Sequence, residues 1–477
     1  MITFLNISVF ITNKISPIIL ILITFWLISC SPSYLHLNNT KNYLLKRKIN
    51  NLIIESEFDA SIGIDIRSLE TSQSLYSYHK NKPFTPASNI KLYTSLTSLI
   101  KLGLDYKFET TIYRKNDNLF IKGGGDPNFT LNNLDSLAKL ISVEISNIDT
   151  IIADETILDS NQFGPGWMWD EGHWWHAAPI SALSLNDNCI SFFVRTEKIG
   201  KPLQIEIFPN TKYVKIINNS TTVFDSLSLK KFTINRDWKN QNNIFTISGN
   251  KIQTQKIDTL KRNISNPALY TATIFAERLN NYNIQTKHIK TGQTPIDAIP
   301  IFKNTSKSLL KINKRMMYDS NNLTAEILTK TLSINDTIPG NWKMGLKIIK
   351  SILADSTKID TSKINIADGS GLSRYNLSSA QNFTILLDYI YHSKYSEYFI
   401  SSLPYGGSNS TLKERLINSN LNIRAKTGSL SGISCLSGYI FSKQYGPLAF
   451  SILINGYIGS SAPYKDFQDK ILTFLLN

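Results

Sequence analysis

Cysteine is scarce in this chain of 477 residues, which contains only Cys30, Cys189 and Cys435. The three residues lie far apart in the sequence and have none of the spacings by which cysteines bind a metal. Their distribution therefore excludes a cysteine-based metal centre. Cys189 and Cys435 are expected to be buried apolar residues, although a disulfide between them stays compatible with an oxidising compartment.

The sequence also lacks the patterns of metal, phosphate and nucleic-acid sites. The run HWWH at 173–176 has no glutamate and no third ligand, so it favours aromatic packing over a metal centre. No lysine follows Gly123–Gly125 at the spacing of a phosphate loop, and a tight turn is expected there. We therefore predict no metal and no cofactor. No nucleic-acid-binding motif appears, and no nucleic-acid partner is expected.

Acidic residues are fewer than basic ones, which leaves a net charge of +15 and a pI near 9.4. The basic residues are scattered rather than clustered, so the charge indicates only an anionic environment such as a cell envelope. With 42% hydrophobic and 18% charged residues, the composition excludes a disordered or fibrous chain. The length allows two or three domains.

One apolar run lies near the N-terminus, from Ile15 to Ile28. At about fourteen residues it is short for a membrane span, and the basic Lys14 precedes it, as in an export signal. The following Leu27–Cys30, LISC, resembles a bacterial lipobox, which implies lipidation of Cys30. We predict a signal peptide at 1–29 and a polar tether at 30–50. A transmembrane anchor is the alternative.

A lipobox of this kind implies a location in the periplasm. Ser31, rather than aspartate, follows Cys30. In lipoprotein signals this residue favours the outer membrane over retention at the inner membrane. The prediction is therefore a periplasmic protein held at the outer membrane by a lipid anchor.

The apolar periodicity predicts an α/β domain that is closed by the two ends of the chain. Residues 61–66 alternate apolar and polar, as a half-buried strand does, and 74–79 supply its hairpin partner. Two further strands are expected near the C-terminus, followed by an amphipathic helix. We predict a discontinuous catalytic domain at 51–107 and 300–477. Short β-like runs between them predict an inserted, β-rich module at 108–299.

The stretch FTPASNIKLYTSL, residues 84–96, places Ser88 and Lys91 one helical turn apart. The Ser-x-x-Lys spacing has little value alone, because seven other pairs in this chain have it and a helix-capping serine explains most of them. Ser88 differs because it follows a proline at a junction between a strand and a helix. There the helix N-terminus favours an oxyanion.

Two later motifs change this assessment. Ser320-Asn321-Asn322 precedes a predicted helix, and Lys426-Thr427-Gly428 precedes a predicted apolar strand. Ser-x-x-Lys, Ser-x-Asn and Lys-Thr-Gly together are the motifs of penicillin-binding proteins and related β-lactamases. A second Lys-Thr-Gly, at 290–292, comes before Ser320 and introduces no long apolar strand. Only the set that begins at Ser88 has the expected order and context.

With these motifs the chain resembles the low-molecular-mass class C penicillin-binding proteins, which are D-alanyl-D-alanine carboxypeptidases and endopeptidases. Similar runs are GGGDPNF at 123–129, GWMWDEGHWWHAAPISALSLNDN at 166–188, DGSGLSRYNLSSA at 368–380 and SLPYGGSNSTLKERL at 402–416. The long separation between the first two motifs matches the insertion typical of this family. The chain departs from the family at Asn321, usually acidic, and at Ser429, usually threonine.

The resemblance implies a serine β-lactamase/transpeptidase-like α/β fold: an antiparallel sheet flanked by helices, a helical subdomain and a large insertion. It implies a serine D,D-peptidase that acts on peptidoglycan stem peptides and is acylated by β-lactam antibiotics. Ser88 would be the nucleophile and Lys91 its base, with the pKa of Lys91 lowered to about 7–8 by burial and by Lys426 as a second nearby cation. The further expected catalytic residues are Ser320 and Asn322, and the expected substrate-binding residues are Lys426, Thr427, Gly428, Ser429, Arg374 and Asp187.

Two other functions remain open at this stage. A serine β-lactamase often positions its water with a Glu-x-x-x-Asn motif, and Glu414 and Asn418 have that spacing. They lie too close to Lys426 in the sequence to loop over the nucleophile. A catalytically inactive envelope-binding protein is the second alternative, and the intact set of three motifs argues against it.

Overall fold

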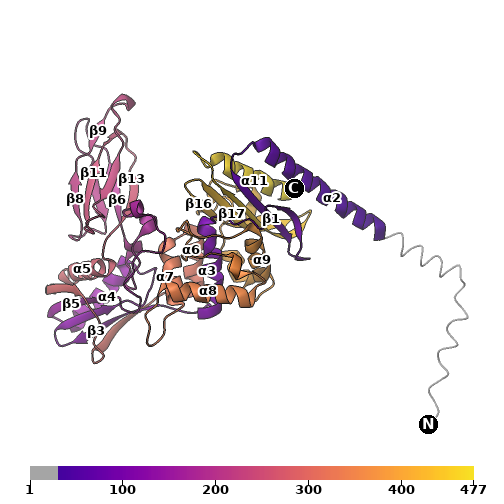
Figure 1. The fold of residues 1–477 in the computed structure, drawn as a ribbon. Coiled ribbons are helices and arrows are strands. Elements are labelled where there is room, and N and C mark those ends of the chain that lie inside the picture. Colours follow the sequence, from indigo (N-terminus) through magenta and orange to yellow (C-terminus); the bar gives the residue numbers. More distant parts are fainter. Residues whose placement is uncertain (1–30, 477) are drawn as a thin grey trace, which may run out of the picture.

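The computed structural model describes residues 31–476, and a five-stranded antiparallel sheet joins the two ends of this segment (Figure 1). In spatial order its strands are β16 (Ile423–Leu430), β17 (Ile433–Ser442), β18 (Gly446–Asn455), β1 (Ser61–Ser68) and β2 (Ser74–Tyr78). Ser61 pairs with Asn455 and Ser68 with Leu448, so the first strand lies beside the last. The predicted hairpin and the predicted closure by the chain ends are confirmed.

Both faces of this sheet are covered by helices because its strands carry apolar side chains on both sides. Along β18, Phe450 and Ile452 pack towards α11 (Ala462–Leu476), the predicted C-terminal amphipathic helix. The alternating Ala449 and Leu453 pack on the other side, towards α3 (Ile90–Leu102) and α9 (Ala380–Tyr391). The period of two along the strand therefore separates two cores.

A helical subdomain lies against α3. Its helices are α6 (Leu309–Asp319), α7 (Asn322–Thr331), α8 (Trp342–Ser356) and α10 (Ser396–Ser402). The side chain of Asn321 caps α7 by accepting a hydrogen bond from the backbone N–H of Thr324. Ser379 caps α9 in the same way. The helix expected to follow the Ser320-Asn321-Asn322 motif is present.

The predicted tether is a helix over most of its length. Residues 31–56 form α2 (Ser31–Ser56), and its C-terminal part packs on α11 (Figure 1). Leu45 and Ile49, one helical turn apart, are 1% and 0% exposed in the core beneath the sheet. The segment predicted to be a tether is therefore helical and partly packed on the domain, because burying these two side chains stabilises the helix. Cys30 lies outside the described residues.

The inserted module contains a second five-stranded sheet, in which parallel and antiparallel pairs are mixed. Its strands are β14 (Thr286–Thr291), β5 (Ile148–Asp154), β4 (Asn118–Lys122), β3 (Glu109–Lys115) and β15 (Ile299–Thr305), and its helices are α4 (Leu131–Glu144) and α5 (Pro267–Asn280). Glu109 pairs with Thr305, so the module ends near 305 rather than at the predicted 299.

The rest of the insertion is a separate β-lobe, seen at the upper left of Figure 1. Its strands are β6 (Cys189–Arg195), β7 (Gln204–Phe208), β8 (Lys215–Asn218), β9 (Thr221–Val223), β10 (Thr233–Arg236), β11 (Ile244–Ser248), β12 (Asn250–Ile252) and β13 (Asp258–Asn263). The rings of Phe192 and Phe245 lie 5.0 Å apart in its core. The predicted β-rich texture is correct here.

Two other expectations concern single features. Cys189 on β6 and Cys435 on β17 are both buried and free, so they are the apolar residues predicted rather than a disulfide. The side chains of HWWH at 173–176 pack ring against ring, also as predicted. Within residues 31–476, no helix has the length and apolar content needed to cross a membrane.

Candidate active site

Ser88 lies in a single 3₁₀ turn, η1 (Ala87–Asn89), directly before α3. Pro86 ends the preceding extended segment, and Ala87 adopts a left-handed conformation with φ of 46°. This turn places Ser88 at the N-terminal end of α3, where the positive end of the helix dipole favours a developing negative charge. The local conformation therefore suits a nucleophilic serine.

Lys91, one turn into α3, is fully buried, as predicted. Its Nζ donates to Ser88 Oγ at 2.9 Å and to Asn322 Oδ1 at 2.6 Å. A third hydrogen bond, of 2.7 Å, goes to the backbone carbonyl of Ser370. Three acceptors thus hold the amine in one position beside the serine hydroxyl.

Burial lowers the pKa of Lys91 to about 7, the value expected of a base that works near neutral pH. The cause differs in part from the sequence prediction, which invoked a second cation as well as burial. Burial is the largest effect, while the carboxylates of Glu326 and Asp368 oppose it by raising the pKa. Lys426 is affected instead: burial and the charge of Lys91 hold its pKa well below the usual lysine value.

The second motif occupies the turn between α6 and α7. Ser320 ends α6 in a left-handed conformation, with φ of 53°, and Asn322 begins α7. Asn322 accepts from Lys91 through Oδ1 and donates from Nδ2 to the carbonyl of His176 at 2.8 Å. Because the amide has one donor and one acceptor in use, its orientation is determined by both partners.

The third motif lies on β16, at the edge of the central sheet. Lys426 is fully buried, and its Nζ donates to Ser320 Oγ at 2.7 Å. Thr427 Oγ1 donates to Thr411 Oγ1 at 2.8 Å. The structure therefore brings all three motifs together. Lys91 is hydrogen-bonded to Ser88 of its own motif, and Lys426 is hydrogen-bonded to Ser320 of the second motif.

Two glycines permit the close approach of backbones to Ser88. A Cβ on Gly428 would lie 2.5 Å from the carbonyl oxygen of Pro86 and 3.2 Å from the N–H nitrogen of Ser88. A Cβ on Gly371 would lie 1.9 Å from the carbonyl oxygen of Ala87, and Gly371 also has φ of +84°. Any larger residue at either position would push the nucleophile out of place.

An open cavity of about 600 Å³ lies over these groups. Ser88, Ser320, Asn322, Thr427 and Ser429 all contribute to its wall, and its outer wall comes from Glu171, Trp175, His176, Leu430 and Ser431. Lys91 and Lys426 lie beneath this surface, behind the serines that they contact. The cavity therefore presents hydroxyls and amide groups to a substrate while both amines stay dry.

The two remaining predicted site residues lie beside this cavity. Arg374 is exposed and donates from Nη2 to the carbonyl of Ser431, at the cavity rim, over 2.9 Å. Asp187 accepts two hydrogen bonds of 2.8 Å from Arg315 and one of 3.1 Å from Asn321. The cavity that holds Ser88 is not lined by Asp187, whose contact with the site is through Asn321.

The sequence analysis missed two buried carboxylates that support Lys91. Glu326 on α7 accepts from the N–H groups of Gly369 and Ser370, at 2.9 and 2.8 Å, and from Trp342 Nε1 at 2.7 Å. Burial and the nearby Asp368 raise the pKa of Glu326. A glutamate within the apolar run of α7 was the signal that could have identified it. Asp368 opens the quoted DGSG run, to which no role was assigned.

The chain is similar to known proteins in sequence and in fold. The chain is 27% identical over 468 residues to the D-alanyl-D-alanine carboxypeptidase of Actinomadura sp. (strain R39), over 92% of this chain and 86% of that protein. The crystal structure of penicillin binding protein 4 (DacB) from Haemophilus influenzae matches 90% of this chain and 99% of its own, with a TM-score of 0.78 and 24% identity. The same protein complexed with a novel β-lactam matches over the same shares, with a TM-score of 0.74 and 24% identity.

The structural likeness confirms the predicted fold. A family model described as the D-Ala-D-Ala carboxypeptidase 3 (S13) family matches residues 45–477. This range holds all three motifs, both helical layers of the sheet and the complete insertion. The chain therefore belongs to the D-Ala-D-Ala carboxypeptidase 3 (S13) family.

Proposed function

We propose that this protein is a serine D,D-peptidase that cleaves the D-Ala-D-Ala bond or D-Ala-linked cross-links of peptidoglycan through an acyl-enzyme on Ser88. The observation that carries this proposal is the hydrogen bond of 2.9 Å between Ser88 Oγ and the Nζ of a fully buried lysine. A dry amine with a pKa of about 7 is a base at neutral pH, which an exposed lysine is not.

In acylation, Ser88 Oγ attacks the carbonyl carbon of the scissile amide while neutral Lys91 accepts the hydroxyl proton. The amide C–N bond then breaks, and the leaving amine takes up the proton that Lys91 accepted, with Ser320, which Lys426 contacts, as the proposed relay. The acyl group remains on Ser88 as an ester. Water hydrolyses the ester, which releases the shortened peptide and restores the serine hydroxyl.

The backbone N–H groups of Ser88 and Ser429 are proposed to stabilise the oxyanion of the tetrahedral intermediate. The short distance from the position of a Gly428 Cβ to the Ser88 nitrogen, 3.2 Å, supports this pairing. Each such donor contributes about 2.7–4 kcal/mol to lowering the barrier. Gly428 is therefore required for the approach of β16 rather than for a contact of its own.

Thr427 and Lys426 are proposed to bind the terminal carboxylate of the substrate. Burial and the charge of Lys91 hold the pKa of Lys426 well below the usual lysine value. An arriving carboxylate favours the charged form, because an opposite charge nearby raises the pKa of an amine. Substrate binding and protonation of Lys426 are thus coupled. Arg374 and Asp187 are proposed to act from the rim and through Asn321, respectively.

Labelling with a fluorescent penicillin tests this function. The wild-type protein is expected to form a stable covalent adduct, and Ser88→Ala is expected to form none. Absence of label on the wild-type protein would contradict the active-serine proposal. The β-lactam complex of the Haemophilus protein supports the choice of probe.

A β-lactamase remains the alternative enzyme, and the same labelling distinguishes it. Rapid loss of the label with fast turnover of penicillin would favour hydrolysis of the antibiotic. The residues that mimic a lactamase water site, Glu414 and Asn418, are both exposed and do not line the cavity over Ser88. Incubation with purified muropeptides then separates a carboxypeptidase, which releases D-alanine, from an endopeptidase, which splits cross-links.

The proposed location is the periplasm, with Cys30 lipidated and the protein held at the outer membrane. The lipobox-like LISC sequence supports this proposal. Processing that globomycin blocks, and membrane association that Cys30→Ala abolishes, are the expected results. Association that survives Cys30→Ala would contradict a lipid anchor at that residue.

A further inference from the structure

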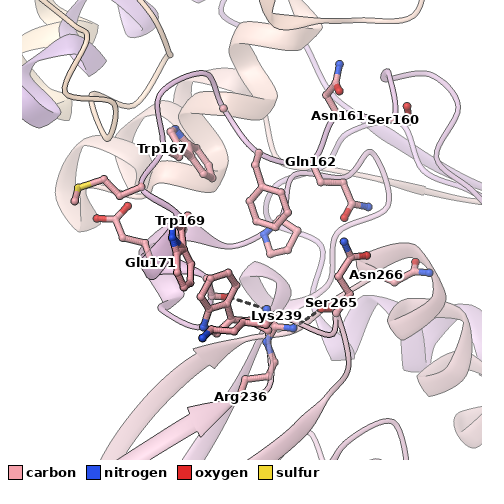
Figure 2. Close-up of a pocket in the computed structure, with 18 of the residues that line it drawn as sticks. Ser160, Asn161, Gln162, Trp167, Trp169, Glu171, Arg236, Lys239, Ser265 and Asn266 are labelled. Carbon is pink, nitrogen blue, oxygen red and sulfur yellow. Dashed lines mark hydrogen bonds between the residues drawn. The ribbon is translucent and has the colours of Figure 1, made fainter.

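A second and larger cavity, of about 810 Å³, lies beside the active site between the 160–179 segment and the β-lobe (Figure 2). Figure 2 shows Trp167 and Trp169 on one side of this cavity, and Asn161, Gln162 and Asn266 on the other. We call it the aromatic cavity. Nothing in the proposed chemistry at Ser88 uses it.

Tryptophan is concentrated around the two cavities. Of the seven tryptophans in the chain, three line the aromatic cavity and one lines the active-site cavity: Trp167, Trp169, Trp238 and Trp175. Trp169 is 65% exposed, although such a side chain is usually buried in a core. Exposed aromatic side chains that gather in a hollow are typical of a binding surface.

The aromatic wall is held in place before any ligand arrives. The rings of Trp169 and Trp238 lie 4.6 Å apart. A Cβ on Gly172 would lie 2.4 Å from the Trp238 ring, so only glycine lets this indole pack on the backbone there. The buried guanidinium of Arg236 donates to the Gly172 carbonyl at 2.7 Å and to Asn263 at 3.0 Å. These contacts join the β10–β11 turn to the 160–179 segment.

The cavity is also lined by amide and hydroxyl groups: Asn161, Gln162, Gln241, Ser265 and Asn266. Two acidic and two basic side chains also line the cavity, and Arg236 has its hydrogen bonds directed to the protein. The charges of these four side chains cancel, so the lining of the cavity does not favour an ionic ligand. Flat apolar rings facing amides suit a neutral ligand that has apolar faces and many hydroxyls.

The aromatic cavity adjoins the active-site cavity at Glu171, which lines both cavities. The Oε2 atom of Glu171 is buried and has no hydrogen-bond partner within the described residues. A buried acceptor without a partner is costly unless a ligand supplies a donor. The junction between the two cavities is thus prepared for a polar ligand that extends from one into the other.

We propose that the aromatic cavity binds the saccharide of the substrate, an N-acetylhexosamine of the glycan strand to which the stem peptide is attached. This inference rests on the proposed peptidase function, because it assumes that the peptide occupies the neighbouring cleft. The faces of the pyranose rings stack on Trp169 and Trp238. The amides opposite hydrogen-bond to hydroxyl and acetamido groups, and Glu171 accepts from a ligand N–H or O–H.

Binding of tri-N-acetylchitotriose to the full chain tests this site, with ligand-observed NMR titration as the measurement. The wild-type protein is expected to bind this sugar, and Trp169→Ala is expected to weaken the affinity by about tenfold or more. Trp174→Ala is the matched control: it removes another exposed tryptophan of the same segment, which stacks on Arg262 and does not line the aromatic cavity. It is expected to change the affinity by less than about twofold.

Failure of the site and failure of the peptidase function give different results. A wild-type protein that fluorescent penicillin labels but that does not bind the trisaccharide overturns the saccharide site alone. Equal loss of affinity in Trp169→Ala and Trp174→Ala also overturns it. Trisaccharide binding by a protein that penicillin does not label overturns the peptidase function and leaves the saccharide site standing.

A kinetic comparison connects the site to catalysis. The wild-type protein is expected to have a lower KM for a disaccharide-linked pentapeptide than for the free pentapeptide, and Trp169→Ala is expected to bring the ratio of the two KM values close to one. The thermal midpoint of Trp169→Ala, measured alongside, shows that the variant is folded. A wild-type KM ratio already near one would show that the cavity is not a substrate subsite.

Discussion

At the residue scale, the site is organised around two buried amines rather than one. Lys91 contacts the nucleophile Ser88, and Lys426 contacts Ser320. Burial lowers the pKa of Lys91 to about 7 and, together with the charge of Lys91, holds the pKa of Lys426 well below the usual lysine value. Ser88 and Ser320 both line the cavity, and the hydroxyl of each contacts one of these amines.

The pH dependence of acylation follows from the pKa of Lys91, which is about 7. The neutral amine is the active base, so the second-order rate of acylation by penicillin is expected to rise with pH through about 7 and then to level off. Measurement of that rate between about pH 5 and pH 9 tests this expectation. A rate that falls as the pH rises through 7 would contradict the assignment of Lys91 as the base.

Glu326→Gln is expected to move this rise to lower pH, because the Glu326 carboxylate raises the pKa of Lys91. The substitution also replaces an acceptor of the Ser370 and Gly369 N–H groups, and a loss of about 1–3 kcal/mol in unfolding free energy is expected. Glu414→Gln, an exposed control outside the cavity, is expected to leave the pH of the rise and the unfolding free energy unchanged. If the acylation rate of Glu326→Gln rises at the same pH as that of the wild-type protein, this carboxylate does not act on the pKa of Lys91.

The residues of the three motifs could be predicted from the sequence, but the buried residues that surround them could not. Ser88, Ser320 and Lys426 were identified because their order along the chain excluded the look-alike pairs. Glu326 belongs to no ordered motif, and a glutamate on a helix is most often solvated, so the sequence does not identify it. Its burial depends on the loop at Asp368, which follows more than thirty residues later and folds against it.

At the element scale, the nucleophile is positioned by a close backbone contact between the 368–371 loop and η1. Gly371 has φ of +84°, and a Cβ there would lie 1.9 Å from the Ala87 carbonyl oxygen. Gly103, with φ of +89°, has no atom within 4 Å of such a Cβ. The two glycines share the unusual conformation and differ in the space around them.

Gly371→Ala and Gly103→Ala are therefore a matched pair. Both are expected to lose about 1–3 kcal/mol of unfolding free energy from the backbone strain. Only Gly371→Ala displaces Ala87, and its rate of acylation by penicillin is expected to fall by about tenfold or more. Chemical denaturation and the acylation rate are the two measurements. Equal acylation rates in the two variants would show that the contact does not position Ser88.

Helix α2 offers a second test, on stability. Leu45→Ala removes a side chain that is 1% exposed and is expected to lower the unfolding free energy by about 2–5 kcal/mol. Leu44→Ala, at a neighbouring position that is 48% exposed, is expected to cost less than about 1 kcal/mol. Urea denaturation of both variants measures the difference. Similar midpoints would mean that α2 is not part of the cooperative fold.

Regular elements could be predicted where periodicity was strong, as in β1, β18 and α11. The segment at 30–50 was interpreted as a tether because its mean composition is polar. Only Leu45 and Ile49 are buried among its described side chains, and two residues one turn apart are too weak a pattern. What stabilises this helix is its partner α11, more than four hundred residues away in the chain.

At the scale of the whole molecule, residues of the insertion make direct contacts with the second motif of the candidate active site. Asn322 donates to the His176 carbonyl, Arg315 and Asn321 bind Asp187, and the buried Lys330 pairs with Asp159. Each contact joins the helical subdomain to the inserted chain. The geometry of the second motif therefore depends on residues outside the catalytic domain.

Asp187→Ala tests this dependence. Loss of the carboxylate releases Arg315 and Asn321, and the rate of acylation by penicillin is expected to fall by about threefold to tenfold while Ser88 remains reactive. Asp297→Ala breaks an exposed ion pair with Lys115 elsewhere in the insertion and is expected to leave the rate unchanged. An unchanged rate in Asp187→Ala would show that the insertion does not influence the motif.

The extent of the insertion was predicted only approximately, because its end is defined by a long-range pairing. β15 aligns Thr305 with Glu109, at the other end of the module, and local sequence contains no sign of that partner. The presence of the insertion was evident from the separation of Lys91 and Ser320. Its division into a mixed sheet and a β-lobe was not, since short β-like runs look alike in both.

Helix α2 has a consequence for the separation of the catalytic domain from the membrane. Its 26 residues extend about 39 Å at 1.5 Å per residue. A flexible chain of that length has a root-mean-square span of about 25–30 Å and samples every shorter distance. With Cys30 lipidated as proposed, the N-terminal part of the helix is a rigid spacer between the lipid and the domain. The catalytic domain is then held away from the membrane by the part of α2 that precedes Leu45, where packing on the domain begins.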